Sequence, residues 1–187
     1  MGSPGPVCAY YSAELQLRVL HAEPASLLEP ILDLGCGPAG TLVAYLRQQG
    51  LEAWGLDRAP SSAPHVQSGD WLESPLGSAR WGTIISHMAF SNHFLREHLH
   101  PSGNPERYAR RYMQVLGALK PAGSFLYAPG LPFLEQHLPA ERYCVERSAV
   151  QDVAGSFVDQ ALRDRVGEAV LYACRVTRRD VSAAPAV

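Results

Sequence analysis

The stretch Ile31-Leu-Asp-Leu-Gly-Cys-Gly37 decides the fold class of this chain. A short apolar run that leads directly into glycines is typical of a buried parallel strand that turns into a helix. Residues 41–49 then place apolar side chains on one helical face, and Gly50 stands where a helix C-cap belongs. Because glycines let a ligand approach the backbone and free helix amides attract an anion, the stretch predicts a ligand-binding strand, turn and helix.

The remaining sequence continues this alternation of strands and connectors. Asn104 can cap a helix and Pro105 is tolerated at its first position, so a helix is predicted from there to residue 119, with residues 120–123 as the turn that stops it. We also expect a short helix within residues 10–21 and a helical turn at 133–138. Further strands are expected at residues 51–57, 65–70, 81–86, 124–128, 142–146 and 169–175. The alternation predicts a mostly parallel, doubly wound α/β sheet with right-handed crossovers.

Length and composition narrow the class of protein. The chain has 187 residues, 47% of them hydrophobic, which suffices for one core with one site. The net charge is −2, without a basic run, so no nucleic-acid partner is expected. Four cysteines without a Cys-x-x-Cys pair indicate free thiols in a reducing cytosol, and no apolar run has membrane-spanning length. We expect a cytoplasmic monomer or homodimer that acts on a small molecule, away from membranes.

The glycine turn admits more than one ligand. Gly35-Cys-Gly37-Pro-Ala-Gly40 also satisfies the dinucleotide pattern G-x-G-x-x-G. Against a dehydrogenase, Asp33 stands before the first glycine where the dinucleotide motif keeps an apolar residue, and the chain leaves little room for a second domain. A P-loop is excluded because Gly-Lys-Ser/Thr is missing. A tight turn without any ligand is the remaining alternative.

Two motifs in register resemble those of class I S-adenosylmethionine-dependent methyltransferases. Residues 31–37 resemble the first motif of that family, and Leu119-Lys-Pro-Ala-Gly123 resembles its turn before the fifth strand. The resemblance implies a three-layer Rossmann-like fold with a mostly parallel seven-stranded sheet and an antiparallel last strand. It also implies S-adenosylmethionine as cofactor and methyl transfer to a small molecule. Residues 23–178 would form the cofactor domain, residues 1–22 an N-terminal lid or helix, and residues 179–187 a disordered tail.

The resemblance also assigns residues to the parts of the cofactor. The methionine end falls to Asp33, Gly35, Cys36 and Gly37, the ribose hydroxyls to Asp57, and the adenine amino group and ring to Asp70 and Trp71. Two departures leave alternatives open: Pro38-Ala39-Gly40 replaces the usual Thr-Gly, so the turn can bulge, and Arg58 could bind a ribose phosphate instead. Asp70 could equally be a helix cap, and Trp71 ordinary core packing.

The loop that follows the fourth strand, Ser86-His-Met-Ala-Phe-Ser-Asn-His93, is where this family directs groups toward the transferred methyl. His87 and His93 are the candidate bases, because imidazole titrates near neutrality. Ser86 and His87 are also assigned to the cofactor, and Asn92 to the substrate. The alternative is that these histidines are solvated loop residues, as we expect for His98 and His100. No metal is expected, because these histidines lack the spacing of a ligand pair.

Aromatic residues suggest how the acceptor is enclosed. Tyr10 and Tyr11 would belong to the N-terminal lid, or pack as one face of a helix, and Tyr127 and Phe133 would wall an apolar pocket. The leading hypothesis is methylation of a small, fairly apolar acceptor, such as a natural-product hydroxyl. A non-methylating reaction such as cyclisation, a non-catalytic interaction protein and a nicotinamide-dependent enzyme remain alternatives, because fold alone does not separate them.

Overall fold

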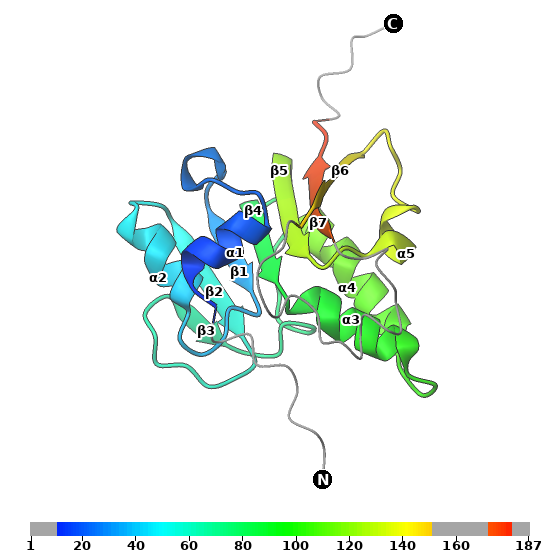
Figure 1. Ribbon diagram of the computed structural model, residues 1–187, viewed down its shortest axis with the longest axis horizontal. Helices are drawn as coiled ribbons and strands as arrows, with labels where there is room; N and C mark the ends of the chain where they lie inside the picture. Colours follow the sequence, from blue (N-terminus) through cyan, green and yellow to red (C-terminus); the bar gives the residue numbers. More distant parts are fainter. Residues whose placement is uncertain (1–10, 151–171, 181–187) are drawn as a thin grey trace, which may run out of the picture.

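The computed structural model describes residues 11–150 and 172–180, and their strands form one sheet in the order β3-β2-β1-β4-β5-β7-β6 (Figure 1). The strands are β1 Ile31–Leu34, β2 Ala53–Asp57, β3 Val66–Ser68, β4 Trp81–His87, β5 Leu119–Ala128, β6 Tyr143–Ala149 and β7 Tyr172–Arg178. The helices are α1 Ala13–Val19, the 3-10 turn η2 Pro24–Ser26, α2 Thr41–Gln48, α3 Phe90–Leu99, α4 Pro105–Ala118 and α5 Pro132–Glu135.

The pairing of the strands confirms the predicted sheet. The strands from β3 to β5 pair in parallel, whereas β7 runs antiparallel to both of its neighbours, β5 and β6. The sheet is therefore mostly parallel, with an antiparallel last strand in chain order. The strand order reverses between β1 and β4, so the crevice at their carboxyl ends is the topological switch point where such sheets bind ligands.

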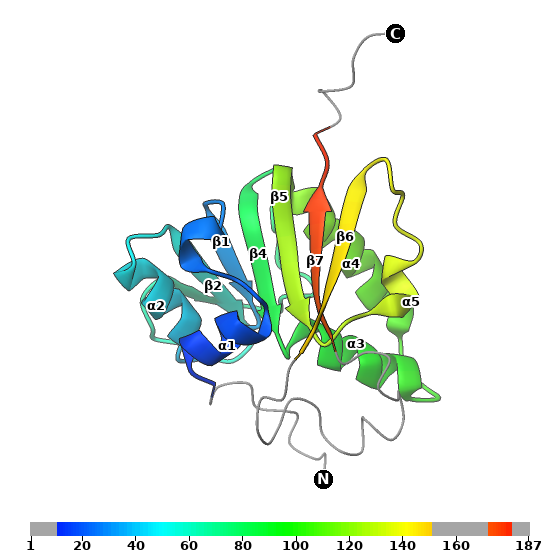
Figure 2. The ribbon, with the colours of Figure 1, turned by 45° about the horizontal axis from the view of Figure 1, so that its top comes forward.

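Each face of the sheet is covered by its own helices (Figure 2). Successive strand residues point to opposite faces, so Ile84 packs on one side and Ile85 on the other. Helices α1 and α2 share a buried cluster with Ile85 through Leu17, Leu42 and Leu46. Helices α3 and α4 share the opposite cluster with Ile84 through Phe90, Leu95, Tyr112 and Leu116. No helix in the described residues is long and apolar enough to cross a membrane.

Most predicted elements are confirmed, with boundaries that differ by a few residues. Helix α4 begins as predicted, since the Asn104 side chain accepts a hydrogen bond from the Arg107 amide at 3.1 Å. The segment after β4 was predicted as a loop, and this is wrong: α3 spans Phe90–Leu99. Helix α4 stops before residues 120–123 as predicted, since it ends at Ala118. These residues belong to β5 instead of a separate turn, at a register irregularity against β4 where Ala122 has φ +61°.

The buried carboxylate of Glu135 joins α5 to three strands. Its Oε1 accepts hydrogen bonds from the Tyr127 hydroxyl at 2.9 Å and the Leu131 amide at 2.7 Å. Its Oε2 accepts from Arg147 Nε at 2.6 Å and the Tyr172 hydroxyl at 2.7 Å. Both oxygens are thus satisfied although the side chain is almost fully buried. This carboxylate fixes α5 against β5, β6 and β7.

Replacing Glu135 by Gln should therefore destabilise the fold. The amide keeps the size of the side chain but presents a donor where the carboxylate received donors, so buried hydroxyls lose their acceptor. We expect the free energy of unfolding, measured in urea, to fall by about 2–4 kcal/mol. Glu141→Gln at an exposed position is the matched control and should change it by less than about 0.5 kcal/mol. Equal stability of the two variants would contradict this role.

Candidate functional site

The glycine turn lies at the switch point, against the backbone that follows β4. Gly35 has φ +81°, and a Cβ built on it would lie 2.3 Å from the Ala89 Cβ, so a side chain there would collide. Gly37 and Gly40 also have positive φ, at 70° and 56°. A Cβ at Gly40 would lie 2.5 Å from Val66 of β3. The turn is thus shaped by glycine alone, and it leaves bare backbone at the carboxyl end of β1.

Asp57 connects this turn to the end of β2. Its Oδ2 accepts a hydrogen bond from the Gly37 amide at 2.8 Å, and its Oδ1 accepts from the Ala59 amide at 2.8 Å. The side chain is half-buried, so it remains accessible from the crevice. The carboxylate predicted to bind a ribose therefore stands at the rim of the glycine turn, 20 residues along the chain from Gly37.

Two groups at the turn have raised pKa values. Asp33 is 2% exposed, and its Oδ2 has no hydrogen-bond partner among the described residues. Burial, and then the charge of Asp57, raise the pKa of Asp33 to about 7. Burial also raises the pKa of the Cys36 thiol, and the charges of Asp33 and Asp57 add to this effect. A cation bound at this point would compensate the Asp33 carboxylate.

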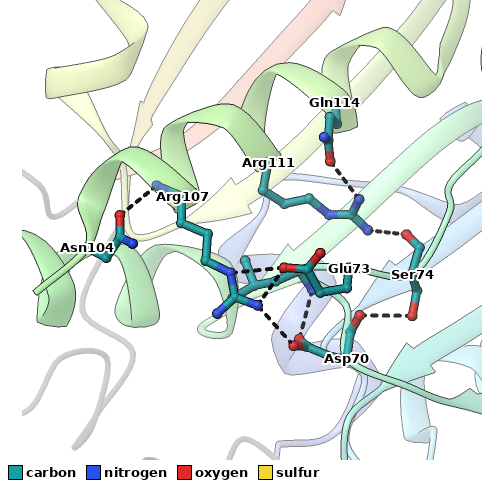
Figure 3. A network of polar contacts seen from close by, with 8 residues as sticks. Asp70, Glu73, Ser74, Asn104, Arg107, Arg111 and Gln114 are labelled. Carbon is teal, nitrogen blue, oxygen red and sulfur yellow. Dashed lines mark hydrogen bonds and ion pairs between the residues drawn. The ribbon is translucent and has the colours of Figure 1, made fainter.

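The loop after β3 carries Asp70, labelled in Figure 3, and Trp71, the next residue in the chain. Asp70 Oδ1 accepts a hydrogen bond from the Leu72 amide at 3.0 Å, and Oδ2 lies 3.3 Å from Arg107 Nη2. The Asp70 side chain is half-exposed, so it can also meet a ligand. Trp71 is 3% exposed and packs against Phe90, with ring centroids 5.7 Å apart. Trp71 is therefore mainly a core residue of the loop.

The Ser86 hydroxyl serves the fold. It donates a hydrogen bond to the Leu34 carbonyl at 2.7 Å and accepts one from the Phe90 amide at 3.1 Å. The side chain is fully buried. Since both hydrogen-bonding directions are used to tie the start of α3 to the end of β1, we no longer assign the Ser86 side chain to a ligand.

His87 closes β4 and lies beside the N-terminal segment. It is 4% exposed, and its ring meets that of Tyr11 edge-on, with centroids 5.1 Å apart. Burial lowers the pKa of His87 to about 4, so the imidazole is neutral near pH 7. A neutral imidazole retains a lone pair that can accept a proton. Tyr10, its predicted companion in the lid, lies outside the described residues.

His93 is on helix α3 and contacts Arg58. Its Nε2 lies 3.2 Å from Arg58 Nη2, and a guanidinium only donates, so Nε2 is the acceptor and Nδ1 carries the proton. Burial lowers the pKa of His93 to about 4, and Arg58 and Arg96 lower it further. The loop after β2 and the helix after β4 flank β1 in the sheet, so this contact spans the carboxyl end of β1.

The residues predicted to bind the substrate have different environments in the structure. Tyr127 is fully buried, and its hydroxyl lies between that of Tyr112, at 2.9 Å, and Glu135. It therefore lines no pocket wall, and that prediction is wrong, because its strand is covered on both faces. Phe133 is 37% exposed and packs on His98, with centroids 4.5 Å apart. Asn92 is half-buried, and its Oδ1 has no hydrogen-bond partner among the described residues.

Some residues that shape this edge were missed from the sequence. Arg107 and Arg111 of α4 hold the loop after β3 (Figure 3), and Ala89 sets the glycine turn. The spacing of four between the arginines indicates one helix face but not what that face contacts.

Cys36, Cys144 and Cys174 are free thiols, while Cys8 lies outside the described residues. Within residues 11–150 and 172–180, no cluster of His, Cys, Asp or Glu could hold a metal ion.

Several solved structures with the same arrangement are methyltransferases. No family model and no curated protein matches the sequence. The plantazolicin methyltransferase in complex with SAH matches at TM-score 0.56 and 12% identity, over 90% of this chain and 84% of that one. An S-adenosylmethionine-dependent methyltransferase from Mesorhizobium loti matches at TM-score 0.51 and 16% identity, over 90% and 98%. This chain has the class I methyltransferase fold.

A ligand-bound structure of the same methyltransferase fold extends the likeness. The Burkholderia thailandensis 1,6-didemethyltoxoflavin-N1-methyltransferase, with 1,6-didemethyltoxoflavin and S-adenosylhomocysteine bound, matches at TM-score 0.51 and 18% identity. The match covers 80% of this chain and 70% of that one. The Rossmann-like fold that the resemblance in sequence implies is thus confirmed.

Within this methyltransferase fold, Asp33 should make stability depend on pH. Folded Asp33 keeps its proton up to about pH 7, whereas the unfolded chain releases it near pH 4. Stability is therefore lost as the pH rises through this window, by at most about 1.4 kcal/mol per pH unit. His87 and His93, with lowered pKa values, contribute the opposite slope from about pH 4 to 6.5.

Asp33→Asn isolates the carboxyl contribution, because the histidines are common to both proteins. The free energy of unfolding of the variant minus that of the wild type should rise between pH 4.5 and 7 and level off above it. Urea unfolding at pH 4.5, 6, 7 and 8 measures this difference. A difference that is constant across the series would show that Asp33 ionises normally in the fold.

Proposed function

We propose that the chain is an S-adenosylmethionine-dependent methyltransferase that acts on a small molecule. The observation that carries the proposal is the joining of the glycine turn to Asp57 at the switch point, above a buried Asp33 with an unpartnered oxygen. Gly35 has no side chain, so the turn can pack directly against Ala89 at the carboxyl end of β1. S-adenosylmethionine is a sulfonium compound with an amino group, a carboxylate and a ribose. Its cationic groups would meet Asp33, its carboxylate the amides at the start of α2, and its ribose Asp57.

The fit runs along the edge of the sheet. The cofactor's methionine part would lie at the glycine turn, where Asp33 would meet its cationic groups and the free amides of α2 its carboxylate. The ribose hydroxyls would donate to Asp57, since a carboxylate suits a diol at the end of a second strand. S-adenosylmethionine supplies an activated methyl group on sulfur. Because β3 lies beyond β2, the nucleobase would extend toward Asp70 and Trp71.

The residues of this chain would orient the acceptor and handle its proton. Displacement at a methyl group requires alignment in a site without water, which burial at the ends of β1 and β4 favours. His87 is the better candidate base, because it ends β4 next to the glycine turn and is covered by Tyr11. His93 has its acceptor nitrogen occupied by Arg58. The residues proposed for the acceptor are Tyr11, Asn92 and Phe133.

The comparisons support a small-molecule acceptor. One similar structure is a methyltransferase with 1,6-didemethyltoxoflavin bound, and this likeness supports a small-molecule acceptor for this chain. In this chain, a fairly apolar acceptor fits the aromatic residues near α3 and α5, and we infer a natural-product hydroxyl as the methylated group. Residues 11–22 would cover the acceptor, an inference supported by the contact of Tyr11 with His87, and residues 1–10 of the predicted lid lie outside the described residues.

Calorimetric titration tests the cofactor first. The purified protein should bind S-adenosylmethionine and S-adenosylhomocysteine with micromolar affinity and should not bind NAD. Asp57→Ala should weaken both affinities by about ten-fold or more, because hydrogen bonds to a charged group are lost. Glu52→Ala, at the opposite end of the same strand, is the matched control and should leave them unchanged. Binding of NAD alone, or of no cofactor, would sink the proposal.

A matched pair of histidine variants tests the assignment of the base. Methyl transfer is followed as formation of S-adenosylhomocysteine against a panel of small phenols, carboxylic acids and thiols. With a hydroxyl acceptor, His87→Asn should lower turnover by about 100-fold without changing cofactor affinity, the usual scale of general-base catalysis. His93→Asn should lower it less than ten-fold. The reverse ranking would assign the base to His93, and no product with any acceptor would favour a non-methylating reaction.

A further inference from the structure

The connection between β3 and β4 lacks regular structure and needs other support. Residues 69–80 contain no helix or strand, although parallel strands of one sheet are usually joined through a helix. Trp71 anchors this loop in the core against Phe90 and Tyr108. The polar support comes from helix α4 on the same side, as Figure 3 shows. The loop thus combines its own turn hydrogen bonds, from the Glu73 and Ser74 amides to the Asp70 carbonyl, with support from side chains of α4.

Arg107 grips the two acidic residues of the loop. Its Nε and Nη2 donate to Glu73 Oε1 at 3.0 and 2.6 Å, and Nη2 lies 3.3 Å from Asp70 Oδ2 (Figure 3). All three side chains are substantially exposed, at 42%, 67% and 50%. Exposed ion pairs stabilise little, so Arg107 orients the Asp70 carboxylate more than it stabilises the fold.

Arg111 holds the loop after β3 more strongly than Arg107 does. It is 4% exposed, its Nη2 donates to the Ser74 carbonyl at 2.7 Å, and its Nη1 donates to Gln114 Oε1 at 2.9 Å. Burial lowers its pKa, while Glu73 and Asp70 raise it. A buried guanidinium that contacts a loop carbonyl fixes the backbone of the loop, because withdrawing it would leave that carbonyl and the charge without partners.

This support acts on one end of the proposed cofactor site, so the inference rests on the proposed function. Asp57 follows β2, and β3 is the next strand outward, so the loop after β3 adjoins whatever extends beyond the ribose. Asp70 presents a carboxylate there, and Trp71 is packed directly after it. A carboxylate only accepts hydrogen bonds, so it favours a nucleobase with an amino group over one with an oxo group at the same position.

We propose that Arg107 and Arg111 are positioning residues that hold Asp70 at the nucleobase end of the site, and that they thereby set its preference for a 6-aminopurine. Neither arginine touches the ligand in this arrangement. Arg111 fixes the backbone of the loop through Ser74, and Arg107 turns the Asp70 carboxylate. Loss of either support lets Asp70 move, and the preference for the amino group falls with it.

The test compares two purine nucleosides that differ at position 6. Affinities for 5′-methylthioadenosine and 5′-methylthioinosine are measured by calorimetry with the full chain, together with S-adenosylmethionine as reference. The wild type should prefer the adenosine compound by about ten-fold or more. Arg111→Met, which keeps the apolar length of the side chain, should reduce this preference to less than about three-fold. Arg110→Met, at an exposed neighbouring position, should leave the preference unchanged.

Each outcome decides between the two proposals. Binding of S-adenosylmethionine with a preference that survives in Arg111→Met would overturn the positioning role and leave the proposed function intact. Failure of the wild type to bind S-adenosylmethionine would instead overturn the proposed function. Should Arg111→Met not fold, Arg107→Met takes its place, because that side chain is exposed. It should reduce the preference at least two-fold, and an unchanged preference would overturn the inference.

Discussion

The turn after β1 packs directly against the backbone after β4. The arrangement of the residues at the carboxyl ends of the parallel strands depends on this contact. A side chain at Gly35 would overlap Ala89, so the two segments meet only because Gly35 has none. Ser86 reinforces the same junction with hydrogen bonds to Leu34 and to the first amide of α3. Asp57 then ties the turn to β2 through the Gly37 amide. Three strand ends are thereby held in one arrangement around bare backbone.

Burial at this junction decides which groups carry charge. Asp33 tends toward its protonated form, and His87 and His93 toward their neutral forms, in each case chiefly because the charged form would lose its hydration. The crevice is therefore less charged than its residue types indicate. A cation bound next to Asp33 would favour its ionised form, and each neutral imidazole keeps a lone pair that can accept a proton.

Side-chain contacts hold the connections between strands that contain no helix. The connections 58–65 and 69–80 have no helix, and each is fixed by polar contacts from elsewhere. Ser61 donates to the Pro38 carbonyl of the glycine turn at 2.7 Å, and the arginines of α4 hold the loop after β3. On the same face of the sheet as α4, Glu135 fixes α5 against β6 through Arg147. The contacts that hold the two loops join residues 23 to 37 positions apart in the chain.

The sequence by itself determined the succession of strands along the chain, the glycine turn, the capped start of α4 and the mostly parallel pairing. It did so because apolar periodicity, glycine and capping residues act locally. It did not predict α3, whose histidines, asparagine and arginine obscure a stripe formed by Phe90, Phe94 and Leu95. Only the tertiary structure buried the Tyr127 hydroxyl against Glu135, occupied His93 with Arg58 and set Arg111 on Ser74. The partners in the last two contacts are 35 and 37 residues apart, a separation at which local pattern carries no information about contact.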